Sequence, residues 1–269
     1  MKMRNPIMKT LALPLLVLAA TTVVRAQLRT YVATSGNDNN ACTTALPCRT
    51  FQGAHDKTSP EGKVVALDTG TFGKTLTITK SITIAAAPGI DAGLTTGIGQ
   101  TAITISAGVH DVVAIQNLSL DGHAVAARGI DFQSGGKLHV DGCVIGNFTG
   151  AGILLDAQAR AFVTDTTVRN NHDGIFVSTG DLDNSTDSVS IDHCRAEANF
   201  SKGFYVSLSK ATIRDSIATG NGLAGFYCYT GVMNITGCLA ANNQTGVFVE
   251  AISSGTGTAR IAYSTVTAT

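Results

Sequence analysis

Apolar and polar positions in this chain repeat with a short and nearly constant period. A glycine followed by alternating apolar residues recurs at Gly129–Phe132, Gly152–Leu155, Gly174–Val177, Gly203–Val206, Gly225–Cys228 and Gly246–Val249. Alternation over so few residues predicts a strand too short to bury its own apolar face. Stacked copies of one such unit would share a continuous core, so the period predicts a solenoid with one coil per repeat.

A second apolar element keeps step with the first. It begins at Ile115, Val140, Val163, Ile191, Ile213 and Ile235, and its fourth position is in turn Leu118, Cys143, Thr166, Cys194, Ser216 and Cys238. Asparagine follows at Asn147, Asn170, Asn199, Asn221 and Asn242, as expected for corners with left-handed backbone and side-chain hydrogen bonds to the turns. Neither the leucine frame nor the helical half of a leucine-rich repeat is present, so the predicted fold class is an all-β parallel β-helix.

The first 26 residues do not belong to the repeat. Three basic residues (Lys2, Arg4 and Lys9) precede the apolar stretch Leu11–Val24, and small residues lead to Ala26. This order predicts a secretory signal peptide cleaved after Ala26, and therefore a secreted or periplasmic protein. The stretch is too short for a transmembrane helix, and no later segment is apolar enough to span a membrane.

The composition of the remaining chain limits its partners and its domain count. Removal of the signal leaves fifteen basic against nineteen acidic residues, and a net charge of −4 argues against nucleic acid as a partner. The chain contains 29 glycines and no tryptophan, and no Pro/Ser linker or charge run divides it. We therefore expect one elongated domain, with a cap region at 27–62 and the β-helix at 63–269.

The six cysteines separate into two groups. Cys42 and Cys48 flank a turn-like segment near the N-terminus, and an oxidising compartment favours a disulfide between them. Cys143, Cys194 and Cys238 occupy alternate coils, roughly 10 Å apart and beyond disulfide reach. Cys228 falls in an inward column of the first strand, so we predict these last four to be buried free thiols.

The N-terminal region adds a family resemblance. The segments Tyr31–Asn40, Pro47–Ala54 and Gly73–Ile84, with Cys42 between the first two, resemble the opening of bacterial pectate-lyase-like right-handed parallel β-helix proteins. The resemblance implies a short helix, about Arg49 to Asp56, that caps the first coil. Such scaffolds host lyases, hydrolases, epimerases and adhesins, so the resemblance implies a polysaccharide partner without deciding the activity.

Equal positions in stacked coils form columns, and two neighbouring columns bring titratable residues together. Asp165, Asp192, His193, Arg214 and Asp215 fall on three successive coils at one outward corner. Arg214 can neutralise a sugar carboxylate, His193 can act as base or acid, and the carboxylates can act as acid, base or cation ligands. The patch is the candidate catalytic site of a polysaccharide lyase or a glycoside hydrolase, and the alternative is a solvated corner of paired charges.

Two further features accompany the patch. The longest interval contains a polar insertion, Asp181–Ser188, whose carboxylates at Asp181, Asp183 and Asp187 make it a candidate Ca²⁺ loop, against a plain solvated insertion. A second outward column carries the aromatic residues Phe176, Tyr205, Tyr227 and Phe248. An exposed ladder of rings can stack on sugars, whereas the alternative is burial under the insertion or against another protomer.

The last repeat begins at Ala259 and stops before its asparagine corner, so the final coil is expected to be incomplete. This coil and the aromatic column are the surfaces on which self-association would occur. Two functions stay open from the sequence. One is an extracytoplasmic protein that binds and modifies polysaccharide, and the other is a non-catalytic surface or adhesion β-helix.

Overall fold

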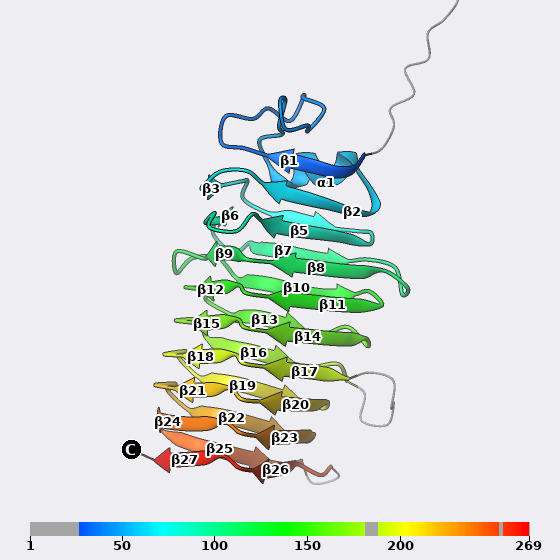
Figure 1. Cartoon of the computed structure of the whole chain (residues 1–269). Helices are drawn as coiled ribbons and strands as arrows, with labels where there is room; N and C mark the ends of the chain where they lie inside the picture. The colour runs from blue at the N-terminus through cyan, green and yellow to red at the C-terminus, as the bar shows by residue number, and fades with distance from the viewer. Residues whose placement is uncertain (1–26, 181–187, 253–254, 269) are drawn as a thin grey trace, which may run out of the picture.

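The computed structural model describes residues 27–180, 188–252 and 255–268. The chain winds through these residues as a right-handed parallel β-solenoid of about nine turns (Figure 1). Its strands form three sheets, named A, B and C in the order in which each coil passes through them, and every strand pairing is parallel. The predicted fold class is therefore confirmed, including the short helix at the N-terminal end.

Sheet A begins under the N-terminal cap and contains β1 (Gln27–Val32), β2 (Thr58–Ala66), β5 (Ile82–Ala86), β8 (Val112–Gln116), β11 (Lys137–Asp141), β14 (Arg160–Thr164), β17 (Val189–Asp192), β20 (Lys210–Arg214), β23 (Val232–Thr236) and β26 (Thr258–Ala262). Sheet B contains β3 (Gly70–Thr71), β6 (Ala92–Thr95), β9 (Leu118–Asp121), β12 (Val144–Gly146), β15 (Thr167–Arg169), β18 (Arg195–Glu197), β21 (Ile217–Thr219), β24 (Leu239–Asn243) and β27 (Thr265–Ala268). Sheet C contains β4 (Leu76–Ile78), β7 (Thr101–Ser106), β10 (Arg128–Ser134), β13 (Ala151–Leu155), β16 (Asp173–Val177), β19 (Lys202–Ser207), β22 (Ala224–Tyr229) and β25 (Thr245–Glu250).

Register between coils turns the sequence repeat into stacks of like side chains. The first apolar position of the glycine repeat forms one inward column, in which each member pairs with the next and all are buried: Ile130, Ile153, Ile175, Phe204 and Phe226. Full burial of such a side chain contributes at most about 1.5–3 kcal/mol. Because the columns run the length of the solenoid, the core is continuous and the outward positions are held in register as well.

The corner between sheets A and B is one residue in the left-handed backbone region, at Gly142, Asp165, His193, Asp215 and Gly237. The next residue is buried and is alternately a thiol and a hydroxyl. Thr166 Oγ1 accepts the backbone N–H of Cys143, and Ser216 Oγ accepts that of Cys194. The alternation seen in the sequence therefore satisfies backbone donors that the turn would otherwise leave unpaired.

The corner between sheets B and C contains a buried asparagine ladder, and here one expectation was wrong. Asn147, Asn170 and Asn242 have the predicted left-handed backbone, but Asn199 and Asn221 do not. These two stack in the next column with Asn171 and Asn243, where each side chain bonds the following asparagine and a backbone carbonyl. Spacing alone had merged two adjacent columns, because asparagine occurs at the left-handed position in some coils and at the following ladder position in others, where Ala198 and Gly220 take the left-handed position.

The asparagine ladder also explains the glycine of the repeat. A Cβ added at Gly174 would lie 2.4 Å from the carbonyl oxygen of Gly203 and 3.0 Å from the Asn199 side-chain nitrogen. The same approach recurs at Gly203, against Gly225 and Asn221. Glycine is therefore required here by close contact between coils, and not by a special backbone angle.

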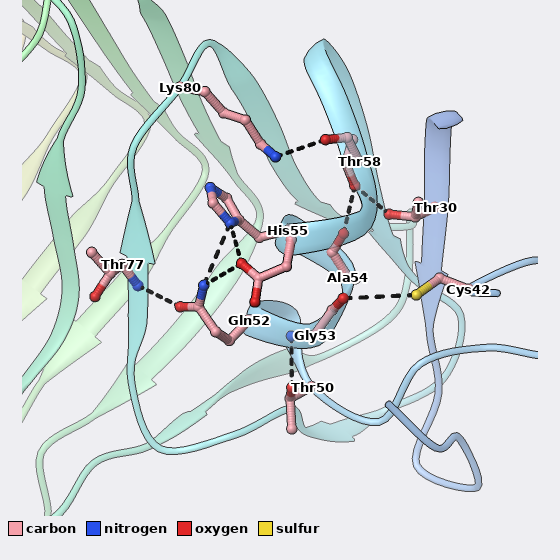
Figure 2. A network of polar contacts seen from close by, with 11 residues as sticks. Thr30, Cys42, Thr50, Gln52, Gly53, Ala54, His55, Thr58, Thr77 and Lys80 are labelled. Atoms are coloured by element: carbon pink, nitrogen blue, oxygen red, sulfur yellow. Dashed lines mark hydrogen bonds and ion pairs between the residues drawn. The ribbon is translucent and has the colours of Figure 1, made fainter. Parts of the chain in front are cut away.

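The N-terminal end of the solenoid is closed by α1 (Phe51–Lys57), whose Thr50 side chain accepts the Gly53 N–H as an N-cap. Phe51 and Ala54 face the core as predicted, and Phe51 contacts Phe72. Figure 2 shows the polar contacts that attach the helix: Gln52 accepts the backbone N–H of Thr77. The helix is thereby joined to the next coil on its polar side as well as through the core.

Cys42 and Cys48 form a disulfide beside this cap, whereas the other four cysteines are free and buried, as the register led us to expect. The predicted signal peptide at 1–26 lies outside the described residues. Within the described ranges, the structure contains no helix long and apolar enough to cross a membrane.

Candidate functional site

The corner patch predicted from the sequence lies where sheet A turns into sheet B. Asp192 at the end of β17 pairs with Arg214 at the end of β20, and His193 and Asp215 follow them at the corner. Asp165 occupies the same corner one coil earlier, where its backbone N–H donates to the backbone carbonyl of Asp192. The left-handed backbone at His193 and Asp215 directs these side chains away from the core, and both are exposed.

Asp192 is the centre of the contacts in the patch. Its Oδ1 lies 2.9 Å from Nδ1 of His193, and its Oδ2 lies 3.5 Å from Nε of Arg214. Arg214 also donates from Nη2 to Ser190 Oγ on the outward face of β17. His193 is therefore an exposed imidazole, with 64 % of its side chain accessible, held beside a carboxylate whose Oδ1 has no hydrogen-bond partner among the described residues.

The patch also contains a set of potential cation ligands. One ligand atom from each of Asp192, His193 and Asp215 lies within 4.8 Å of the other two. Carboxylate oxygens with an imidazole nitrogen suit a divalent metal ion, and two carboxylates this close also fall near the spacing used by retaining glycosidases. Asp165 is a neighbour of this group, but no hydrogen bond or ion pair within the described ranges joins its side chain to the other four.

The aromatic column predicted as an exposed ladder is only partly exposed. Phe176, Tyr205, Tyr227 and Phe248 do stack in successive coils of sheet C, with ring centroids 4.2–5.2 Å apart. However, Tyr227 is 9 % exposed and donates its hydroxyl hydrogen to Glu250, and only Phe248, at 40 %, is well exposed. The rings therefore cover one another, and this column offers a sugar less free surface than the sequence suggested.

Lys202 adds to this covering over two of the rings, and its position corrects a second expectation. The sequence indicated a surface ion pair with Asp173, but the two side chains are only 15 % and 13 % exposed, with Nζ 3.7 Å from Oδ1. The ammonium also lies 4.4 Å from the ring centroid of Tyr205 and 5.0 Å from that of Tyr227. Cation–π contacts thus occupy the faces that a sugar ring would need.

Sequence reasoning missed the outer face of sheet A next to the patch. His139 on β11 and Phe162 on β14 are paired in register and stack, with ring centroids 5.0 Å apart and an interplanar angle of 12°. Burial, followed by the charge of Lys137, lowers the pKa of His139. The sequence did contain a signal for this face. In Lys137–Asp141 and in Arg160–Thr164 apolar and polar residues alternate, so the first, third and fifth residues of each strand must face outward.

The polar insertion proposed as a Ca²⁺ loop, with Asp181, Asp183 and Asp187, lies outside the described residues. A useful comparison for the patch is His123 on another part of the surface. It is also exposed and lies 3.8 Å from a carboxylate, that of Asp121, but no arginine joins this pair. Among the described ion pairs, the Asp192 carboxylate alone contacts both a histidine and an arginine.

Comparison with known proteins extends the description of the fold. A family model described as a right-handed β-helix region matches residues 95–244, more than half of the chain. Among solved structures, pectate lyase Pel9A is similar with a TM-score of 0.63 and 17 % identity, over 90 % of this chain and 77 % of that one. ORF18 of Geobacillus virus E2 is similar with a TM-score of 0.55 and 15 % identity, over 88 % and 60 %. No curated protein matches the sequence significantly.

Proposed function

Because the chain belongs to the right-handed β-helix family, we propose that it binds a polysaccharide at the corner patch of Asp192, His193, Arg214 and Asp215. The observation that carries the proposal is the position of the Asp192 carboxylate, which contacts both an exposed imidazole and a guanidinium. The fold shared with a pectate lyase supports a sugar polymer as the ligand, since a long rigid solenoid presents an extended surface to an extended chain.

The same geometry supports proton transfer to or from the bound sugar. The contact with Asp192 places the exposed His193 imidazole at the corner, where it can serve as a general acid or base toward a bound sugar. Arg214, on the other oxygen of the Asp192 carboxylate, places positive charge in the same patch, where it can stabilise a carboxylate or a developing negative charge on the sugar. Asp215 adds a second carboxylate at the edge of the patch. A divalent cation held by Asp192, His193 and Asp215 would supply further positive charge to an acidic sugar.

Binding and turnover can be tested together on the chain that starts at Gln27. We would incubate it with a panel of neutral and acidic polysaccharides, measure retardation in affinity electrophoresis, and follow both unsaturated products and new reducing ends. We expect at least one polysaccharide to be bound, and His193→Ala with Arg214→Ala to weaken that binding about tenfold or more. Unsaturated products would identify a lyase, and reducing ends alone would identify a hydrolase.

His123→Ala is the matched control, because it removes an exposed histidine beside a carboxylate outside the patch. Equal loss of binding in the control and in the His193 variant would contradict the proposal, as would full binding by the double variant. Binding without any product would leave the site as a polysaccharide-binding surface and favour the non-catalytic alternative.

We also propose that the protein is exported. The N-terminal residue of protein recovered outside the cytoplasm should then be Gln27.

A further inference from the structure

A cavity of about 400 Å³ lies at the other end of the sheet A strands from the corner patch. It is formed by three successive turns that lead from sheet C into sheet A, on the right of Figure 1, with Gly135 and Gly136 in the middle turn. The polar groups that line it are His110, Lys137, Gln158 and Arg160. All four can donate hydrogen bonds, and no acidic residue is among the lining residues.

Positive charge is concentrated at this cavity by the register of the strands. Lys137 begins β11 and pairs directly with Arg160, which begins β14, so both side chains leave the same outward column one coil apart. Adjacent strands are about 4.8 Å apart, so two cationic side chains lie close together at the edge of the cavity. The Lys137 ammonium is the group of this pair that an anionic ligand would neutralise.

The acidic residue that lies between the lining residues His110 and Val112 does not neutralise Lys137. Asp111 precedes β8, but its Oδ1 accepts from Ser81 Oγ and its Oδ2 accepts from the Gly108 N–H, both at 2.7 Å. Its contact with the cavity is through its backbone, since its carbonyl accepts the N–H of Gly136 and of Lys137. In the described parts of the chain, no carboxylate lies within ion-pair distance of the Lys137 ammonium.

The outer face of sheet A, which carries His139 and Phe162, connects the cavity to the corner patch. From Lys137 to Asp141 the strand covers about 13 Å, and the stacked rings of His139 and Phe162 lie midway along it. A ligand that follows the strands would thus meet cationic donors first, a flat ring next, and the His193 corner on the next coil last. Aromatic faces pack against the apolar face of a sugar, and cationic donors bind its acidic substituents.

We infer that this cavity, with Lys137 as its principal cationic group, is an oxyanion-binding subsite. It would take the carboxylate of an acidic sugar in the polymer or a free inorganic oxyanion. As a subsite for a polymer it rests on the proposed function, and it adds to that function a preference for acidic sugars. Lys137 fixes the preference, because a methyl ester at the same position would lose the charge–charge attraction.

The test compares Lys137→Gln with Lys210→Gln. Lys210 begins β20 in the same outward column, two coils beyond Arg160, and does not line the cavity. Affinity would be measured by calorimetry at low salt for an oligogalacturonate and for its methyl ester. We expect Lys137→Gln to weaken binding of the free acid by about tenfold and that of the ester by less than twofold, with Lys210→Gln near wild type. Lys137→Arg should retain most of the affinity.

Equal losses in the two glutamine variants, or equal losses for acid and ester, would overturn the inference, because both outcomes indicate unspecific charge attraction or a packing defect. If the protein binds neither oligosaccharide, the panel of polysaccharides decides the proposed function, and a titration with inorganic sulfate decides the subsite separately. Amide resonances of Gly135 and Gly136 should then shift in the wild type and stay unchanged in Lys137→Gln. No shift in the wild type would overturn the subsite as well.

Discussion

Single residues hold the coils together through buried polar contacts as much as through apolar ones. Asn199 accepts the backbone N–H of Asn171 and donates to the carbonyl of Val168, so one side chain connects neighbouring coils at their corner. Removing it leaves buried groups without partners, and each such group costs about 1–3 kcal/mol. The ladder therefore fixes the register on which every outward column depends.

Replacing this residue should be costly, whereas an exposed asparagine of the same corner should be dispensable. We expect Asn199→Ala to lower the free energy of unfolding by about 3 kcal/mol, measured from the urea midpoint. Asn170→Gly is the control, because it keeps the left-handed backbone at an exposed position and should change stability by only about 0.5 kcal/mol. Similar losses in the two variants would show that the ladder is not a special source of stability.

The four buried thiols should be unreactive in the folded protein. Burial raises the pKa of Cys143 to about 11 and that of Cys194 to about 12, so almost no thiolate exists at neutral pH. Burial also raises the pKa of Cys228 and of Cys238. With a thiol-specific colour reagent at pH 8, we expect no reaction in the native protein and four thiols per chain after unfolding without reductant. Rapid native labelling, or six thiols, would contradict this assignment.

At the scale of elements, the cap helix α1 carries a pH-sensitive contact. His55 is buried with its Nδ1 2.9 Å from Asp56 Oδ1, and in the described structure its Nε2 has no hydrogen-bond partner. Burial lowers the pKa of His55 below its ordinary value near 6.5. The unfolded chain therefore takes up the proton first on acidification, and stability falls as the pH drops below about 6.5.

This dependence can be assigned by substitution. In urea unfolding between pH 7.5 and 5.5, the wild type should lose stability toward the acid side, and His55→Gln should lose less, because it has no group to protonate. His123→Gln, at an exposed position, should follow the wild type. A wild-type slope that survives in His55→Gln would assign the pH dependence to other groups.

Strand positions and register could be predicted from the sequence, but surface properties could not. From the repeat period we predicted that Asp192 lies beside Arg214 and that Tyr205 lies beside Tyr227, and the strand pairings in the structure are the same. Exposure depends on long side chains that cross columns, and the spacing contains no signal that Lys202 lies over two tyrosine rings. The asparagine columns were merged because asparagine suits both the left-handed position and the buried position after it, and a spacing of four or five residues does not tell them apart.

At the scale of the whole molecule, the candidate site depends on rigidity. Coils held in register present the Lys137 cavity, the His139–Phe162 rings and the His193 corner along the strands of sheet A. Family membership predicts this scaffold but not the residues on it, because each outward column varies independently of the core. The patch was accessible to sequence reasoning only because its five residues share a corner position.

The central claim is that a polysaccharide binds across the outer face of sheet A to the corner patch. The most direct measurement is a crystal structure of the chain from Gln27 with an oligosaccharide of the tightest-binding polymer. We predict electron density for sugar within hydrogen-bond distance of His193 Nε2 and Arg214, extending toward Phe162. Density confined to the aromatic column of sheet C, or to sheet B, would contradict the account.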